Sequence, residues 1–221
     1  MISPMKTSIL IFDGITALDA VGPYEVLRSV PGWEVEFVAA TTGEKRTDSG
    51  HLGLSADHAL ADVTETDLVL VPGGKGNRPL LEDEEVLAWL REIDRQTRWT
   101  TSVCTGSLVL GAAGLLQGKR ATGNWLYLEP LRAYGADPVS ERFVEDGRIV
   151  TAAGVSAGID MALHLVGQEA GPEVAQAVQL ALEYDPQPPH DAGAPHKAPA
   201  AIVEAVTAVS EVKDSTLNLR D

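Results

Sequence analysis

Residues 100–107 read Thr-Thr-Ser-Val-Cys-Thr-Gly-Ser, and the mostly apolar run Leu108 to Leu116 follows them directly. The first four residues suit a buried β-strand, Cys104 stands at the turn, and small residues open a segment of helical composition. This strand–turn–helix order is typical of a nucleophile elbow, which exposes one side chain at the carboxyl edge of a parallel sheet. The stretch therefore predicts an α/β fold with a reactive group at Cys104.

Short β-rich runs, several of them nearly continuous in apolar residues, alternate with helical segments on both sides of this stretch. The expected strands are residues 8–12, 34–39, 67–71, 99–103 and 148–151, and the expected helices between them are 23–30 and 82–97. Such alternation predicts a doubly wound, mostly parallel sheet with helices on both faces, as in flavodoxin-like folds. Asp146-Gly147 separates two strand-like runs, which predicts a small antiparallel hairpin.

The last third of the chain changes in character. Helical patterns cover residues 158–170 and 172–184, with a break at Gly171-Pro172. Residues 185–200 contain five of the 13 prolines and are expected to form an extended surface segment. A helix over about 201–212 follows and is too short to fold alone. We therefore predict a single domain over residues 1–221.

Composition excludes several classes of protein. The chain has 17 Lys and Arg against 32 Asp and Glu, a net charge of −15, whereas a nucleic-acid binder needs a basic face. The longest small-and-apolar run is about half of the roughly 20 residues that span a bilayer. We expect neither a nucleic-acid nor a membrane partner. A lone cysteine and the lack of a secretory signal pattern favour a cytoplasmic location.

Cys104 admits two interpretations. A lone cysteine is most often a small buried hydrophobe. At a strand–helix turn, however, the first helical amides stabilise a thiolate, which is expected to lower the thiol pKa and to activate the side chain as a nucleophile. The same amides suit a developing negative charge. The turn context favours the nucleophile.

The Cys104 block, residues 101–122, resembles the ThiJ/PfpI superfamily, and within it the bacterial isocyanide hydratases. Further similarity lies in Leu-Asp-Ala-Val-Gly-Pro at 18–23, Val-Pro-Gly-Gly at 71–74, Gly-Val-Ser-Ala-Gly-Ile-Asp at 154–160 and Leu-Glu-Tyr at 182–184. The Cys104 block is specific to the superfamily, whereas Asp19 and Thr105 point to the hydratase branch. The resemblance covers residues 7 to about 200.

The resemblance implies a flavodoxin-like sandwich, a homodimer and hydration of an isocyanide to the N-substituted formamide, with no metal or organic cofactor. It makes Cys104 the nucleophile and Asp19 its acidic partner. Thr105 and Gly74 are placed where backbone donors line the site, and Val155 on a helix-start loop near the cysteine. The implied chemistry passes through a thioimidate, with Asp19 as proton donor and later as base, provided that burial raises its pKa.

Two positions depart from related proteins. The peptidase-like branch has His directly after the cysteine, and Thr105 stands there instead, which disfavours a Cys-His protease. Related hydratases carry His before the tryptophan that follows this block, whereas this chain has Asn124 before Trp125. Asn donates hydrogen bonds but does not titrate near neutrality, so Asn124 is a binding residue and not a proton carrier.

Several alternatives remain open at this point. Asp19 precedes Gly22-Pro23, a pattern that also suits a simple helix N-cap. The five histidines lack metal-ligand spacing, Gly73 to Gly76 lacks the spacing of a phosphate loop, and the four tryptophans are expected to be packing residues. Alternative functions are a glyoxalase-like or deglycase-like enzyme on small dicarbonyls, a redox-sensing thiol protein, or a ligand-binding module like the sensor half of transcription regulators.

Overall fold

The computed structural model describes residues 2–217 of the 221, and side chains as far as residue 210. The chain divides into two compact units, Met1–Glu183 and Tyr184–Asp221. The first unit holds a seven-stranded sheet, and the second contains helix α6 (Ala200–Leu217) preceded by an extended proline-rich segment. No helix in residues 2–217 is long and apolar enough to cross a bilayer.

The central sheet has the strand order β10-β11-β7-β6-β1-β2-β5. Its members are β1 (Met5–Leu10), β2 (Trp33–Ala39), β5 (His58–Ala59), β6 (Leu68–Val71), β7 (Trp99–Val103), β10 (Phe143–Asp146) and β11 (Ile149–Ala152). All neighbours pair in parallel except β10 with β11. The order β2-β1-β6-β7-β11 is the flavodoxin-like order, so the predicted fold class is confirmed.

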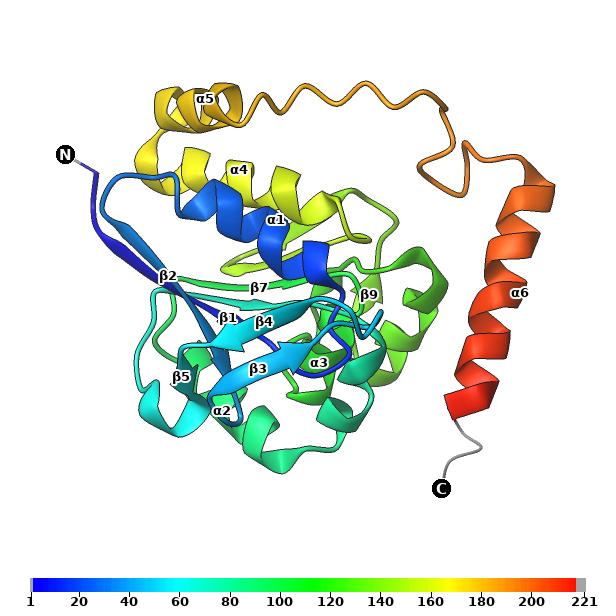
Figure 1. Ribbon diagram of the computed structural model, residues 1–221, viewed down its shortest axis with the longest axis horizontal. Coiled ribbons are helices and arrows are strands. Elements are labelled where there is room, and N and C mark those ends of the chain that lie inside the picture. Colours follow the sequence, from blue (N-terminus) through cyan, green and yellow to red (C-terminus); the bar gives the residue numbers. More distant parts are fainter. Residues whose placement is uncertain (1, 218–221) are drawn as a thin grey trace. The chain divides into compact units, whose positions relative to one another are not determined.

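Helices cover both faces of this sheet. α1 (Ala17–Leu27), α4 (Ala157–Ala170) and α5 (Pro172–Ala181) lie on one side, and α2 (Glu84–Asp94) and α3 (Gly106–Ala112) on the other (Figure 1). Strands such as β6, Leu-Val-Leu-Val, are buried along their whole length because both faces are covered. The chain turns to opposite faces after β1 and after β6, and ligands bind at such switch points in open α/β sheets.

Smaller elements complete the first unit. They are the antiparallel pair β3 (Gly43–Arg46) and β4 (Gly53–Ala56), the parallel pair β8 (Arg120–Ala121) and β9 (Asp137–Pro138), and the 3₁₀ helices η1 (Leu60–Asp62), η2 (Lys75–Asn77), η3 (Pro79–Leu81), η4 (Trp125–Tyr127) and η5 (Glu129–Tyr134). The sequence did not predict the β3–β4 hairpin. The predicted hairpin at Asp146-Gly147 exists, but its strands β10 and β11 continue the main sheet.

The first helix begins earlier than the predicted 23–30. α1 starts at Ala17 and runs through Pro23, which should interrupt a helix because it has no N–H to donate to the carbonyl of Asp19. Packing compensates for this loss. A Cβ on Gly158 of α4 would lie 2.9 Å from Pro23 Cγ, so the two helices meet at this proline. Asp19 is therefore the third residue of α1 and is not the N-cap, which is Thr16.

Candidate active site

Cys104 occupies the turn between β7 and α3 with a left-handed backbone, φ 60°. Few residues other than glycine adopt this conformation, and it turns the side chain out of the strand direction. The Cys104 amide donates to the carbonyls of Ala152 and Ala153 at 3.1 Å, which fixes the turn on the end of β11. Gly106 permits the following helix start, because a Cβ there would lie 1.9 Å from the Val71 carbonyl oxygen.

Asp19 is fully buried beside this turn. Its Oδ2 accepts a hydrogen bond of 2.9 Å from the Gly73 amide, and its Oδ1 has no hydrogen-bond partner among the described residues. Burial raises the pKa of Asp19 from its ordinary 3.8 to about 7. The Gly73 amide and the nearby Cys104 thiol offset part of this rise, and the charge of Asp48 adds to it. Near neutral pH, Asp19 is thus poised to hold or release a proton.

The thiol differs from the sequence expectation. Burial and the charge of Asp19 raise the pKa of Cys104 from 9.0 to about 12, although Asn124 and the amides of Thr105 and Val155 lower it. The expected lowering of the thiol pKa was wrong for the free protein. The helix-start amides act on a thiol that is buried away from water and faces a carboxylate, and these two effects outweigh theirs. Because the charges of Asp19 and Cys104 interact, their two protons leave in two steps whose pKa values belong to the pair and not to either residue alone.

Thr105 and Gly74 meet next to the thiol. The Gly74 amide, which was predicted to line the site as a donor, donates to Thr105 Oγ1 at 3.1 Å. The Thr105 hydroxyl therefore occupies this donor. Asn77 Nδ2 donates to the Thr105 carbonyl at 2.8 Å, which gives the turn a second hydrogen bond from the same segment. Gly73 has to be glycine, because a Cβ there would lie 2.6 Å from the Thr105 nitrogen.

Asn124 is oriented by its own helix start. Its Oδ1 accepts a hydrogen bond of 3.0 Å from the Leu126 amide and caps η4. This cap assigns the oxygen to the backbone, so Nδ2 points toward Cys104 and donates to Sγ at 3.4 Å. Asn124, where this chain differs from the related hydratases, is therefore in direct contact with the thiol.

Val155 is the second non-glycine residue with a left-handed backbone at this site, φ 43°. For a β-branched residue this is an outlier, and strain of this kind collects at functional sites. The conformation aims the Val155 amide at the thiol, where it lowers the pKa of Cys104. Asp19, Asn124 and the amides of Thr105 and Val155 thus act on the Cys104 thiol, whereas the Gly74 amide is bound to Thr105 Oγ1.

Three further residues shape the site and were missed from the sequence. Gly73 binds Asp19 through its amide, Asn77 holds Thr105, and Asp48 of the β3–β4 connection accepts a hydrogen bond of 3.0 Å from Thr16 Oγ1 near the start of α1. The run Gly73 to Asn77 carried a signal, because closely spaced glycines after a strand mark close backbone approach. Asp48 carried none, since the hairpin that brings it here was not predicted.

The raised pKa of Asp19 has a consequence for stability. Between pH 4 and pH 7 the folded protein binds a proton that the unfolded chain has released, so stability falls as pH rises. Three pKa units correspond to on the order of 4 kcal/mol. We expect Asp19→Asn to unfold at a higher temperature than the wild type at pH 8 and at a similar temperature at pH 4. Calorimetry measures the melting temperatures of both proteins at pH 4 and pH 8. An equal change of the two melting temperatures between these pH values would contradict the expectation.

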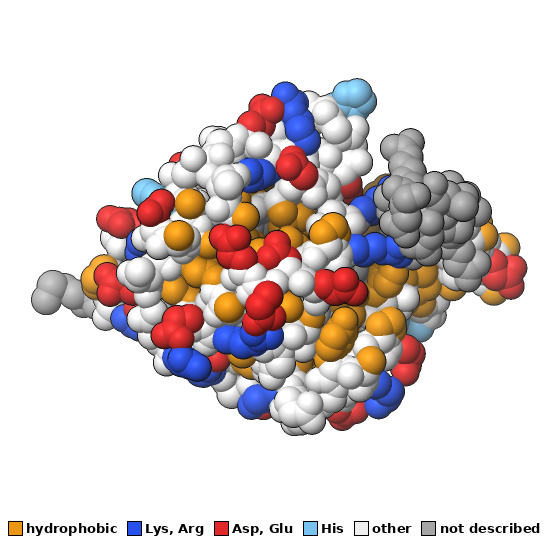
Figure 2. Space-filling model, turned by 90° about the horizontal axis from the view of Figure 1, so that it is seen from below, with side chains coloured by type: hydrophobic (Ala, Val, Ile, Leu, Met, Phe, Trp, Pro, Cys, Tyr) orange, Lys and Arg blue, Asp and Glu red, His pale blue; other side chains and the backbone are white. Residues whose placement is uncertain are grey.

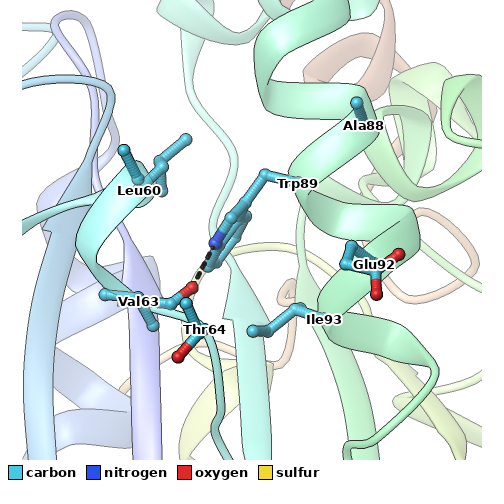
Figure 3. A pocket seen from close by; sticks show the side chains of 8 residues that line it. Leu60, Val63, Thr64, Ala88, Trp89, Glu92 and Ile93 are labelled. Atoms are coloured by element: carbon cyan, nitrogen blue, oxygen red, sulfur yellow. Dashed lines mark hydrogen bonds between the residues drawn. The ribbon is translucent and has the colours of Figure 1, made fainter.

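A separate pocket of about 430 Å³ lies between η1 and α2 (Figure 3). Apolar side chains including Leu60, Val63 and Ile93 line it, and the Trp89 indole nitrogen donates to the Val63 carbonyl at 3.0 Å. Its residues precede β6 and β7, whereas Cys104 follows β7, so pocket and thiol lie at opposite edges of the sheet. None of the predicted site residues lines it.

Charged side chains mix on the surface. On the face shown in Figure 2, lysines and arginines lie in small groups between acidic side chains, without the broad basic surface that phosphate binding needs. Across the described part of the chain, no group of three His, Cys, Asp or Glu side chains is arranged to hold a metal ion.

Comparison with known proteins gives a consistent picture. The model of the DJ-1/PfpI family matches residues 5–168. The isonitrile hydratase of Pseudomonas putida is 44% identical over 98% of this chain and 99% of its own length. Protein DJ-1 homolog A of Arabidopsis thaliana is 34% identical over 85% of this chain and 49% of its own. The crystal structure of a ThiJ/PfpI family protein from Pseudomonas syringae superposes with a TM-score of 0.91 at 34% identity, covering 94% of this chain and 86% of that one.

Proposed function

The chain belongs to the DJ-1/PfpI family, and from this premise we propose that it hydrates isocyanides, R–N≡C, to N-substituted formamides. One observation carries the proposal: a buried carboxyl group with a pKa near 7 stands beside the single cysteine of the chain. Hydration of an isocyanide needs a nucleophile and a proton at the same carbon atom, and this pair supplies both. The 44% identity to an isonitrile hydratase over nearly the whole chain supports it.

The reactive form of the pair carries one negative charge. Most of the charge lies on Asp19, as the two pKa values require, but moving the proton from sulfur to Asp19 gives a thiolate next to a neutral acid. In that form the repulsion between the two groups is gone. Asn124 Nδ2 and the amides of Thr105 and Val155 then stabilise the sulfur anion. Burial of Asp19 thus keeps a proton on its carboxyl group, and the three donors stabilise the thiolate of Cys104.

The first step joins thiol and isocyanide. The Cys104 thiolate attacks the terminal carbon, and Asp19 transfers its proton to the same carbon, so that the product is the thioimidate Cys–S–CH=N–R. The step adds one S–C bond and one C–H bond and leaves Asp19 as a carboxylate. No metal ion is required, because the proton supplies the electrophilic activation.

The second step consumes water. The Asp19 carboxylate takes a proton from water and passes it to the nitrogen as the hydroxide adds to the thioimidate carbon, which gives the adduct Cys–S–CH(OH)–NH–R. As this adduct collapses, its hydroxyl proton goes to Asp19. Collapse of the adduct breaks the S–C bond, releases R–NH–CHO and returns the thiolate and the protonated Asp19. One carboxyl group therefore serves as acid and then as base.

Direct assay tests the proposal. Wild-type protein incubated with phenyl isocyanide is expected to form formanilide, which chromatography detects. The same protein incubated with methylglyoxal should leave it unchanged. Consumption of methylglyoxal without formamide production would contradict the proposal and favour the dicarbonyl chemistry.

Asn124 offers a second test of the site. Removing a hydrogen bond to a charged group costs about 1.5–3 kcal/mol, so Asn124→Ala should lower kcat/KM roughly 10- to 100-fold. Asn124→Asp is the matched variant, because Asp retains the helix cap and therefore the stability. Its negative charge raises the thiol pKa, so we expect it to be at least as inactive as Asn124→Ala while melting like the wild type. An Asp variant with normal kinetics would exclude Asn124 as a donor to the thiolate.

The proposal includes a homodimer in the cytoplasm. Two-fold dimers are the commonest soluble homo-oligomers, and a working thiol suits a reducing compartment. Light scattering should give twice the 23.4 kDa mass of the chain. A mass of one chain at assay concentration would remove the dimer from the account and leave the chemistry unaffected.

A further inference from the structure

The loop after β6 binds the segment that carries Asp19. The Gly73 amide donates to Asp19 Oδ2 at 2.9 Å, and the Gly73 carbonyl accepts from the Thr16 amide at 3.0 Å. Gly76 adds a third contact, because its amide donates to the Gly14 carbonyl at 3.1 Å. In these three hydrogen bonds the loop uses only its backbone, so it is fixed on the Asp19 segment without a side chain of its own.

The same loop reaches the Cys104 turn with one side chain, that of Asn77. This side chain is buried, and its Nδ2 donates to the Thr105 carbonyl at 2.8 Å. Burying an amide costs stability unless it is hydrogen-bonded, so this contact accounts for a polar side chain at a buried position. The Gly74 amide binds the hydroxyl of the same threonine. The loop therefore holds Thr105 both at its side chain and at its carbonyl group.

Thr105 connects the strained cysteine turn to α3. Its carbonyl also accepts from the Leu108 amide at 3.0 Å in the first turn of that helix, but its side chain caps no helix amide. The left-handed backbone of Cys104 is a conformation that persists only where surrounding contacts enforce it. The Thr105 amide lowers the pKa of the Cys104 thiol. A displacement of Thr105 would therefore change how well the thiolate is stabilised.

We propose that Asn77 is a positioning residue for the hydration reaction, because it holds Thr105 so that the Cys104 turn stays opposite Asp19. The inference rests on the proposed function and adds to it a residue outside the reacting pair. The loop is fixed on Asp19 through Gly73, so a donor from the same loop to Thr105 sets the separation of the two reacting groups. Misplacing reacting groups by 1 Å can lower a rate by about 100-fold.

Two substitutions separate the hydrogen bond from the volume that the side chain fills. Asn77→Ala removes both the donor and the volume, whereas Asn77→Leu removes the donor and keeps a side chain of similar size. We expect both variants to lower kcat for phenyl isocyanide about 10- to 100-fold, with KM within about threefold of the wild type, because the reacting groups are misplaced. Lys75→Ala is the matched control. Lys75 is exposed on the same 3₁₀ turn, η2, and its replacement should leave kcat within about twofold.

Alkylation of the thiol by iodoacetamide gives a second readout, which a loss of stability alone would not lower. At pH 8 and well below the melting temperature, both Asn77 variants should react about 3- to 10-fold more slowly than the wild type, because the Thr105 amide is no longer held against the thiolate. If Asn77 served stability only, its replacement would loosen the turn and leave Cys104 equally or more reactive. Unchanged or faster alkylation in the folded variants would therefore overturn the proposal, whatever the change in kcat.

The remaining outcomes are equally decisive. A wild-type kcat in Asn77→Leu would make Asn77 a packing residue and overturn its role as a donor. If only one of the two variants folds, that variant decides, and failure of both to fold would assign Asn77 to stability and overturn the proposal. Wild-type protein that forms no formamide would contradict the proposed function instead, and the alkylation rates would still test whether Asn77 positions the Cys104 turn.

Discussion

Cys104→Ser is expected to lose isocyanide turnover by roughly 10³-fold or more while remaining folded. The two side chains are nearly isosteric, and Cys104 is buried without a disulfide, so the substitution fits the turn. A hydroxyl, however, is a far weaker acid than a thiol, and a carboxyl group with a pKa near 7 does not remove its proton. The measurement is formamide production with phenyl isocyanide, alongside a melting curve.

Ser102→Ala is the control for this substitution. Ser102 lies two residues earlier on β7, is equally buried and has an Oγ without a partner among the described residues. Its replacement changes a side chain of the same strand without touching the thiol, so activity should stay near the wild-type value. A folded Cys104→Ser protein that keeps more than a tenth of the wild-type kcat would remove Cys104 from the chemistry.

Asp19→Asn should lower kcat by about 10²–10⁴, the usual range for loss of a general acid–base. Asn retains the acceptor for the Gly73 amide, so the local structure is preserved while the proton is gone. Asp19→Glu is expected to keep partial activity, because it retains the carboxyl group in a crowded pocket. Both variants are measured by initial rates of formamide production across pH 5–9.

Asp48→Asn tests the smaller contribution of a neighbouring charge. Asp48 is an exposed carboxylate whose charge acts on Asp19 from a distance and is the smallest of the causes that shift its pKa. Screened charges of this kind have small effects, so kcat should change less than about threefold. Near-normal turnover in Asp19→Asn would contradict the acid–base role and leave Asp19 a structural residue that binds the Gly73 amide.

Much of the scaffold could be predicted because parallel strands leave local signals. A continuous apolar run marked β6, the strand–turn–helix pattern around Cys104 marked β7, and the Asp146-Gly147 turn marked the β10–β11 hairpin. Parallel pairing then brings the ends of β7 and β11 to one edge, which places Val155 near Cys104. The start of α1 could not be predicted, because Pro23 is tolerated only through its packing against Gly158 of another helix.

The electrostatics of the site lay beyond local reasoning. The helix start after Cys104 is visible in the sequence and argues for a low thiol pKa. Two effects oppose this lowering of the thiol pKa: burial by the surrounding elements and the charge of Asp19. Asp19 stands 85 residues earlier in the chain, so both effects depend on the complete fold. The motif thus pointed to Cys104, whereas only the structure gave the direction of the pKa shift of its thiol.

The most direct test of the account is intact-protein mass spectrometry of Asp19→Asn after mixing with cyclohexyl isocyanide. Without the carboxylate, thiolate attack is slowed but hydrolysis of the thioimidate lacks its base, so an adduct should accumulate. We predict a mass increase equal to the whole isocyanide, located on Cys104 by peptide mapping and absent from the Asp19→Asn, Cys104→Ser double variant. Continued formamide production by Asp19→Asn with no adduct on Cys104 at any time point would contradict covalent catalysis by this pair.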